Sequence, residues 1–430
     1  MIASRETILS LLYRIGTIGF SFAGVSFLIS NLGAEQYGAW ATLVSTLVWI
    51  QMSDLGIGYV IKNRVAARED LAVLCDQIAV AVQLAFLIGL ALIVLYVLGG
   101  MRLSVVRDFP LEAGVIYITA FLCLPAMIGV NILQGLNLST VSFQASMLQS
   151  LAWLVLVLSL GRDVSLRTLA FAFAALWLLN STYTFFRGYR ALGLGRLSFG
   201  IRLLKRRPLS DALPLLRIGG AFFLLQISSL VLFNLGTYLA YSYFSASAAA
   251  RYDILNKIYQ IPMTLFNVLI AIAWSSIATF ISRGQVASLS QLHTRLVGVS
   301  LGGGVLLLAS SMVIVGPFVR LYSHEQLEAE QVEIFWFAAQ IVTQMVAYAG
   351  AVFMNAAERL RTQMLFAIAS TVLFLPIFFC LTNYLGGIAA IPLATLLVML
   401  PSALYFNFYV RRHIIGTLAP MSGKICKCSE

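Results

Sequence analysis

The sequence predicts an all-α integral membrane protein, with twelve transmembrane helices in two pseudo-symmetric six-helix bundles and both termini in the cytoplasm. Three observations predict this class. The 430 residues are 60% hydrophobic and only 10% charged, whereas a soluble domain has roughly 25% charged residues. Long apolar runs recur along the whole chain, and one sequence unit occurs in both halves. A soluble protein is therefore excluded.

The apolar runs are each about 20 residues or longer, enough to cross a hydrocarbon core of about 30 Å as an α-helix. They are too long, and alternate too little, for transmembrane strands. The first run carries Arg14 and precedes Ala34 and Glu35, a poor context for signal cleavage, so we expect it to remain as a helix. The runs span 8–30, 37–60, 74–98, 112–133, 141–160, 166–187, 214–243, 250–281, 295–316, 331–355, 362–383 and 386–409.

One short sequence unit occurs twice and indicates two related halves. Arg14–Gly16 followed by Asn31–Gly33 recurs, at the same spacing, as Arg217–Gly219 followed by Asn234–Gly236. A repeat after six spans has the same orientation in the membrane, as in transporters that hold substrate between two halves. The only long loop is a basic amphipathic segment, typical of a membrane surface, and it separates the halves. The predicted segments are a bundle over 1–187, a linker over 188–213, a bundle over 214–410 and a cytoplasmic tail over 411–430.

Basic residues predict the orientation. With an even number of spans both termini lie on one side, and most Lys and Arg lie there too. The positive-inside rule makes that side cytoplasmic. The net charge of +11 then reflects topology beside anionic lipid, so we expect no nucleic-acid partner. The opposite loops carry Arg102, Arg107, Arg162, Arg167 and Arg320.

The eighth run contains the clearest polar constellation. Asp253, Lys257, Gln260, Thr264 and Asn267 are spaced to form one stripe of a helix. Lipid cannot satisfy such a stripe, so it must face protein or a water-filled cavity. Lys257 is too deep to reach the membrane surface easily. Either Asp253 and Lys257 form an ion pair that only neutralises two buried charges, or the stripe lines a cavity.

Charges near the helix ends allow two interpretations each. Arg14 and Arg217 either extend to lipid headgroups or flank a cavity suited to phosphate. Arg251 is either an anchor at the periplasmic edge or part of a cationic wall. Asp54 either pairs with Arg14 or exchanges a proton or Na⁺. Asp253 is the other candidate for ion coupling.

The tenth run adds Gln340, Gln344, Tyr348 and Asn355 on nearly one face. Amides and a phenol suit sugar hydroxyls, but they also form hydrogen bonds between membrane helices. The three histidines form no cluster, and no catalytic or metal-ligand motif is present, so we expect neither an enzyme nor a metal site. Cys426 and Cys428 are too few to define a metal site.

Two segments resemble a known family. FLISNLGAEQYGAWA at Phe27–Ala41, with Asp54–Gly58, resembles the N-terminal signature of polysaccharide-biosynthesis flippases. These include the O-antigen (Wzx-type) transporters of the multidrug/oligosaccharidyl-lipid/polysaccharide (MOP) superfamily. Tyr252–Pro262, with Lys257 before Tyr-Gln-x-Pro, is similar to the eighth helix of that superfamily, including the lipid II flippases.

The resemblance implies a MATE-like fold and flipping of an undecaprenyl-pyrophosphate-linked oligosaccharide, such as an O-antigen unit of lipopolysaccharide, across the bacterial inner membrane. Lys257 matches the cationic position of the eighth helix, and Arg14 a basic position of the first. No cofactor is expected beyond a proton or Na⁺ gradient. Membrane lipids, a glycan polymerase and chain-length machinery are the implied partners. The expected substrate-binding residues are Lys257, Arg14, Arg217, Arg251, Gln260, Asn267, Gln340 and Gln344, and the ion-coupling candidates are Asp54 and Asp253.

Two other functions stay open at this point. A cation-coupled multidrug exporter of the same fold would need a cavity of negative potential. The drug-exporting branch tends to place a carboxylate in the first or seventh helix, where this chain has Arg14 and Arg217. A non-transporting scaffold or a membrane enzyme of glycan assembly is the third possibility, and an enzyme would need converging carboxylates.

Overall fold

The computed structural model describes residues 5–67, 70–161, 164–193, 212–357 and 359–416, and every regular element in these ranges is helical. Contacts divide the chain into two compact units, Met1–Leu230 with Tyr241–Ser247, and Val231–Ala240 with Ala248–Glu430. Most of the predicted linker and tail, with Cys426 and Cys428, lies outside the described residues. The boundaries predicted at 187/188 and 213/214 therefore stay a prediction.

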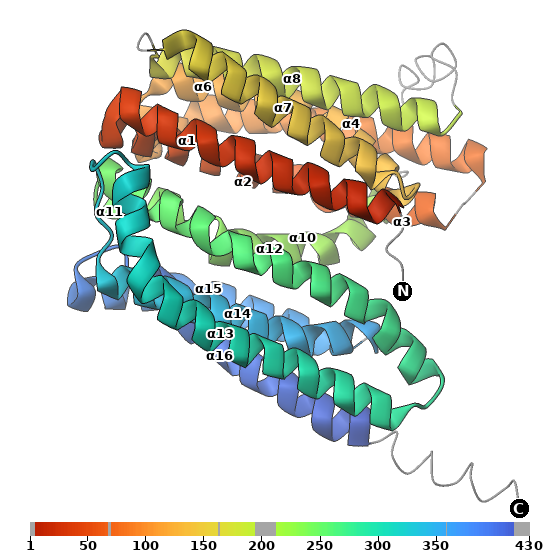
Figure 1. The fold of residues 1–430 in the computed structure, drawn as a ribbon. Coiled ribbons are helices and arrows are strands. Elements are labelled where there is room, and N and C mark those ends of the chain that lie inside the picture. Colours follow the sequence, from red (N-terminus) through yellow and green to blue (C-terminus); the bar gives the residue numbers. More distant parts are fainter. Residues whose placement is uncertain (1–4, 68–69, 162–163, 194–211, 358, 417–430) are drawn as a thin grey trace, which may run out of the picture. The chain divides into compact units, whose positions relative to one another are not determined.

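In the first unit α6 contacts α4 and α8, and α1 contacts α7 (Figure 1). Its core contains Leu28, Ile29, Leu43 and Ile78, all fully buried. The helices are α1 (Arg5–Ser45), α2 (Leu47–Gln51), η1 (Met52–Asp54), α3 (Ile57–Ala66), α4 (Leu71–Gly99), η2 (Gly100–Arg102), α5 (Ser104–Asp108), α6 (Pro110–Gly135), α7 (Ser139–Leu160), α8 (Leu166–Ala191) and most of α10 (Leu213–Phe233).

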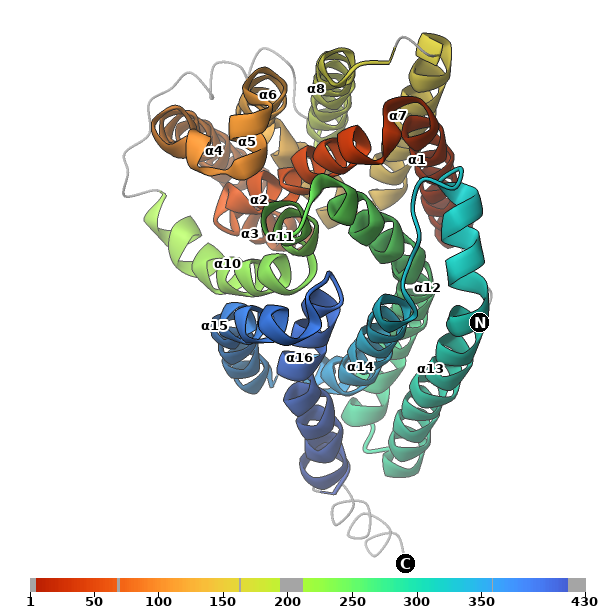
Figure 2. The same ribbon diagram turned by 90° about the vertical axis from the view of Figure 1, so that its left-hand side faces the viewer.

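In the second unit α14 packs between α13 and α16, and α15 packs on α16 (Figure 2). The core is aromatic, with Phe337, Phe353, Phe374 and Phe378 buried. The helices are most of α11 (Gly236–Tyr243), α12 (Ala246–Ser282), α13 (Val286–Tyr322), α14 (Gln331–Ala356), α15 (Leu360–Leu385), α16 (Ala390–Tyr409) and the π-helix η5 (Val410–Ile415).

Nine helices within the described ranges are long and apolar enough to span a membrane, or ten if the bent pair in 213–233 counts as one span. One of the nine, Leu9–Asp54, has 46 residues, about 69 Å of helix at 1.5 Å per residue, and contains two of the predicted runs. The 37-residue α12 is not among the nine. A multi-pass membrane protein is therefore supported, whereas the number twelve stays a prediction.

The repeated Asn-Leu-Gly unit interrupts a helix in both places. Gly33 has φ 82° and ψ 163° within α1, a conformation that costs glycine least. In the other copy, α10 ends at Phe233 and α11 begins at Gly236. The repeat therefore coincides with a helix interruption in each of its two copies.

Candidate functional site

The α12 helix has two distinct faces. One is buried and packs on α14: the Tyr252 and Tyr259 rings lie 5.0 and 5.8 Å from the ring of Phe337. The Tyr259 hydroxyl donates to the carbonyl oxygen of Ile334 at 3.0 Å. These contacts fix the rotation of α12, so the polar stripe predicted from the sequence lies on a different face.

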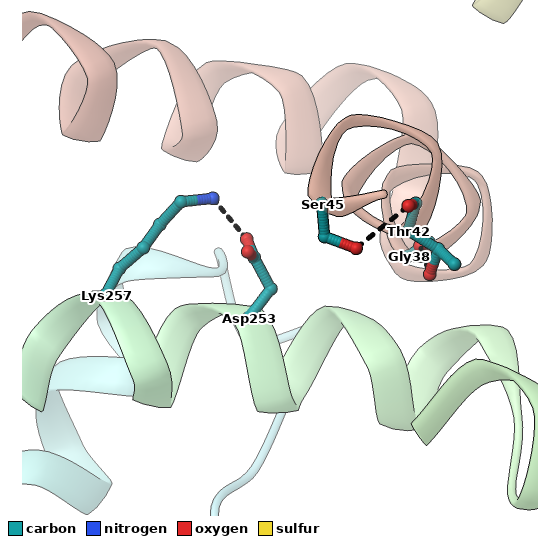
Figure 3. A network of polar contacts seen from close by, with 5 residues as sticks. All are labelled: Gly38, Thr42, Ser45, Asp253 and Lys257. Carbon is teal, nitrogen blue, oxygen red and sulfur yellow. Dashed lines mark hydrogen bonds and ion pairs between the residues drawn. The ribbon is translucent and has the colours of Figure 1, made fainter. Parts of the chain in front are cut away.

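The polar face becomes more open along the helix. Asp253 is buried, Gln260 is half-buried and Asn267 is exposed. Lys257 and Asp253 extend toward one another and form an ion pair (Figure 3). The Lys257 side chain remains 32% exposed, and its ammonium group is paired with Asp253. The predicted i, i+4 pair is therefore present, and whether the stripe also binds substrate stays a prediction.

Arg251 forms an ion pair that joins α12 to α14. Its Nη2 lies 2.9 Å from Oε1 of Glu333, whose side chain is 2% exposed. Its Nη1 donates to the carbonyl oxygen of Glu328 at 3.4 Å. Glu333 also accepts from the backbone N–H of Glu330 at 3.1 Å, as part of a capping box at the start of α14. This arrangement gives Arg251 a structural role and neutralises its charge.

The two glutamines of α14 are buried. Gln340 is 6% and Gln344 is 4% exposed. The Gln344 amide donates to the hydroxyl of Tyr348 at 3.4 Å, and its carbonyl oxygen has no hydrogen-bond partner. An unpaired buried acceptor is a polar group available to a ligand or a water. A role in sugar binding remains a prediction for both residues.

Arg14 and Arg217, the two arginines of the repeat, are exposed. The Arg14 guanidinium lies 4.1 Å from the centroid of the Phe143 ring on α7, a cation–π contact. The predicted pairing of Arg14 with Asp54 is wrong: the Asp54 carboxylate accepts the backbone N–H groups of Gly56 and Gly58 instead. The glycines beside these arginines pack closely, since a Cβ on Gly16 would lie 2.9 Å from the sulfur of Met147.

Asp54 lies where the helix is interrupted between η1 and α3. Leu55 and Gly56 both have left-handed backbone conformations, with φ 54° and 74°. The Asp54 carboxylate accepts the N–H of Gly56 at 2.9 Å and that of Gly58 at 3.0 Å. The side chain therefore satisfies backbone donors that the interruption leaves without carbonyl partners.

The sequence pattern does not identify the residues that lie near Arg251 and Asp54. The pattern of apolar runs singled out none of Glu333, Asn131 and Gln226. A polar residue in an otherwise apolar run is the signal that could have found Asn131 and Gln226. Within the described ranges, His, Cys, Asp and Glu form no group that could hold a metal ion.

Solved structures of transporters have the same fold. An inward-facing MATE family transporter of the MOP superfamily is similar with TM-score 0.75, 14% identity, and coverage of 96% of this chain and 99% of that one. The lipid II flippase MurJ gives TM-score 0.71 and 12% identity, covering 94% and 87%. A MOP superfamily transporter from Pyrococcus furiosus, described as having a binding pocket of reversed polarity, gives 0.60 and 15%, covering 96% and 96%.

The chain has the fold of the MOP superfamily transporters. No protein-family model and no curated protein sequence matches it. The similarity confirms the all-helical, MATE-like fold expected from the resemblance. The similar structures themselves are of transporters and a flippase. The fold is common to drug exporters and lipid flippases, so it does not distinguish between their substrates.

Proposed function

We propose that this protein flips an undecaprenyl-pyrophosphate-linked oligosaccharide, such as a polysaccharide repeat unit, from the cytoplasmic to the periplasmic leaflet by alternating access. The observation that carries the proposal is Lys257, a partly exposed cationic side chain on the polar face of a long helix. A charge at such a position is costly and rarely without function. Binding of an anionic pyrophosphate would compensate the free-energy cost of placing this positive charge within the membrane.

Other polar groups of the chain fit the two parts of this substrate. Asp253 keeps Lys257 neutralised until a pyrophosphate takes its place. Gln260 and Asn267 lie further along the same face, where the side chains are more exposed. Their side-chain amides can hydrogen-bond sugar hydroxyls. Gln340 and Gln344 supply further amides from α14, while Arg14 and Arg217 are exposed cations that attract a phosphorylated headgroup. Arg251 contributes through the position of α12, because Glu333 occupies its guanidinium group.

The membrane setting is part of the proposal. We infer a bacterial inner-membrane protein with twelve spans, cytoplasmic termini and two six-helix halves. It would act beside a glycan polymerase and its chain-length machinery, and it would draw energy from a proton or Na⁺ gradient. The similarity to MurJ, a lipid II flippase with this fold, supports a lipid-linked glycan as the substrate of this chain.

A vesicle assay tests the function directly. Purified protein is reconstituted with a radiolabelled lipid-linked oligosaccharide, and a membrane-impermeant glycosidase measures the fraction of glycan in the outer leaflet. Active protein should make almost all of the glycan accessible, compared with about half in vesicles without protein. In the same vesicles, gradient-driven transport of a cationic dye without glycan flipping would identify a cation-coupled multidrug exporter and reject the proposal.

A further inference from the structure

A groove between α7 and α8 is open to the surroundings of the first unit. It has a volume of about 230 Å³, and six of its eight lining residues are apolar or aromatic. Two of them, Leu148 and Leu179, are 51% and 65% exposed. Both helices are long and apolar enough to span a membrane, and an exposed leucine on such a helix faces hydrocarbon. The groove therefore has the surroundings and the lining that an acyl chain requires.

Two arginines line a second cavity between the same two helices. This cavity has a volume of about 160 Å³, and Arg187 and Arg190 of α8 meet the apolar residues Leu133, Leu138 and Val141 there. Both arginines are exposed. Neither guanidinium forms an ion pair with a carboxylate in the part of the chain that the structure describes. Two arginines without a carboxylate, beside apolar side chains, are suited to a phosphate that carries an apolar chain.

The two cavities follow one another along α7 and α8. Tyr183 lines the groove, and the Arg187 guanidinium lies 6.0 Å from the centroid of its ring. On α7, Val141 of the arginine cavity and Ala145 of the groove are four residues apart and so lie on one helix face. From Arg187 to Leu176, at the far end of the groove, α8 rises about 16 Å. One leaflet contributes about 15 Å of hydrocarbon, so the distance matches the depth of one acyl chain.

We propose that α7 and α8 bind one molecule of an anionic diacyl phospholipid, with its phosphate on Arg187 and Arg190 and one acyl chain in the groove. In the predicted topology this end of α8 faces the cytoplasm, where anionic lipids gather beside basic residues. The lipid is a partner of the protein and not its cargo, because the site uses none of the residues assigned to the glycan substrate.

The polar residues of the groove favour a diacyl phospholipid over other phosphorylated ligands. Gln149 and Asn180 are the two polar residues of the lining, and their amide groups donate hydrogen bonds to the ester carbonyl oxygens of a glycerolipid. A prenyl phosphate has no ester carbonyl, and inorganic phosphate has no chain to fill the groove. The two positive charges favour a net negative lipid over a zwitterionic one.

Native mass spectrometry of the full-length protein in detergent tests the site by counting bound dioleoylphosphatidylglycerol. One molecule should bind at least about fivefold more tightly than dioleoylphosphatidylethanolamine. Arg187→Gln and Arg190→Gln should each weaken binding roughly fivefold, and the double variant about 25-fold. Ala152→Leu should prevent binding, because Ala152 lines the groove and is exposed, so a larger side chain fills the groove without disturbing the core.

Two matched controls come from elsewhere on α8. Arg167→Gln removes an exposed arginine from the other end of the helix, and Ala175→Leu fills a separate cavity between α6 and α8. Both should bind the lipid as the wild type does, and thermal unfolding confirms that every variant folds. Equal binding of the two lipids, or unchanged binding by Ala152→Leu, would overturn the inference. Displacement of the lipid by inorganic phosphate alone, or by an equal amount of undecaprenyl phosphate, would overturn it as well.

Discussion

Gly56 and Gly219 bring two backbones into direct contact. A Cβ on Gly56 would lie 2.2 Å from the carbonyl oxygen of Gly219, and a Cβ on Gly219 would lie 2.6 Å from that of Leu55. The helix α10 therefore crosses the interruption before α3 at a distance that only glycine permits, as small residues do in membrane helix packing. Gly219 belongs to the repeated Arg-Ile-Gly unit, so one copy of the repeat packs against the chain that holds Asp54.

Gly219→Ala should destabilise the protein although alanine is the better helix former. Alanine gains about 1 kcal/mol of helix propensity over glycine, but here its methyl group would collide with a backbone carbonyl that cannot move away alone. Gly220→Ala is the matched control, because a Cβ there meets nothing within 4 Å. Thermal unfolding of the two purified variants measures the difference. Equal or higher stability of Gly219→Ala would contradict the close approach.

The Arg251–Glu333 pair should stabilise the contact between α12 and α14. Replacing Arg251 with methionine leaves Glu333 buried and uncompensated, which costs about 3–5 kcal/mol. Replacing both residues, as in Arg251→Met with Glu333→Leu, should restore most of the stability, because two apolar side chains need no compensation. A double-mutant cycle of chemical unfolding measures the coupling. Additive effects of the two substitutions would show that the ion pair contributes nothing.

Asp253→Asn should tighten the binding of inorganic pyrophosphate. The substitution removes the anion that competes for Lys257, and a partly exposed i, i+4 pair is worth up to about 1 kcal/mol, or roughly two- to fivefold in affinity. Isothermal titration of purified protein gives the dissociation constant, with Thr264→Val as an uncharged control on the same face. Weaker binding would mean that Asp253 holds Lys257 in place for the substrate instead of competing with it.

Local patterns predicted much of the site, because they depend on residues within one helix. The stripe from Asp253 to Asn267 and the Lys257–Asp253 pair follow from helical periodicity. The repeated Asn-Leu-Gly unit coincides with a helix interruption in both copies, at Gly33 and between Phe233 and Gly236.

Contacts between distant helices could not be predicted in the same way. Arg251 pairs with Glu333 because Tyr252 and Tyr259 pack on Phe337 and fix how α12 rotates against α14. Asp54 was expected to pair with Arg14, yet the helix interruption supplies it with two backbone donors, the N–H groups of Gly56 and Gly58. The run of apolar residues does not show which residues of another helix lie near Asp54.

The central claim is that Lys257 receives the pyrophosphate of a lipid-linked glycan, and the glycosidase-access assay with Lys257→Ala and Lys257→Arg tests it most directly. A hydrogen bond to a charged group contributes about 1.5–3 kcal/mol, so the alanine variant should flip the glycan roughly 10- to 100-fold more slowly. The arginine variant keeps the charge and should retain most of the activity. Flipping at the wild-type rate by Lys257→Ala, at equal amounts of folded protein, would contradict the claim.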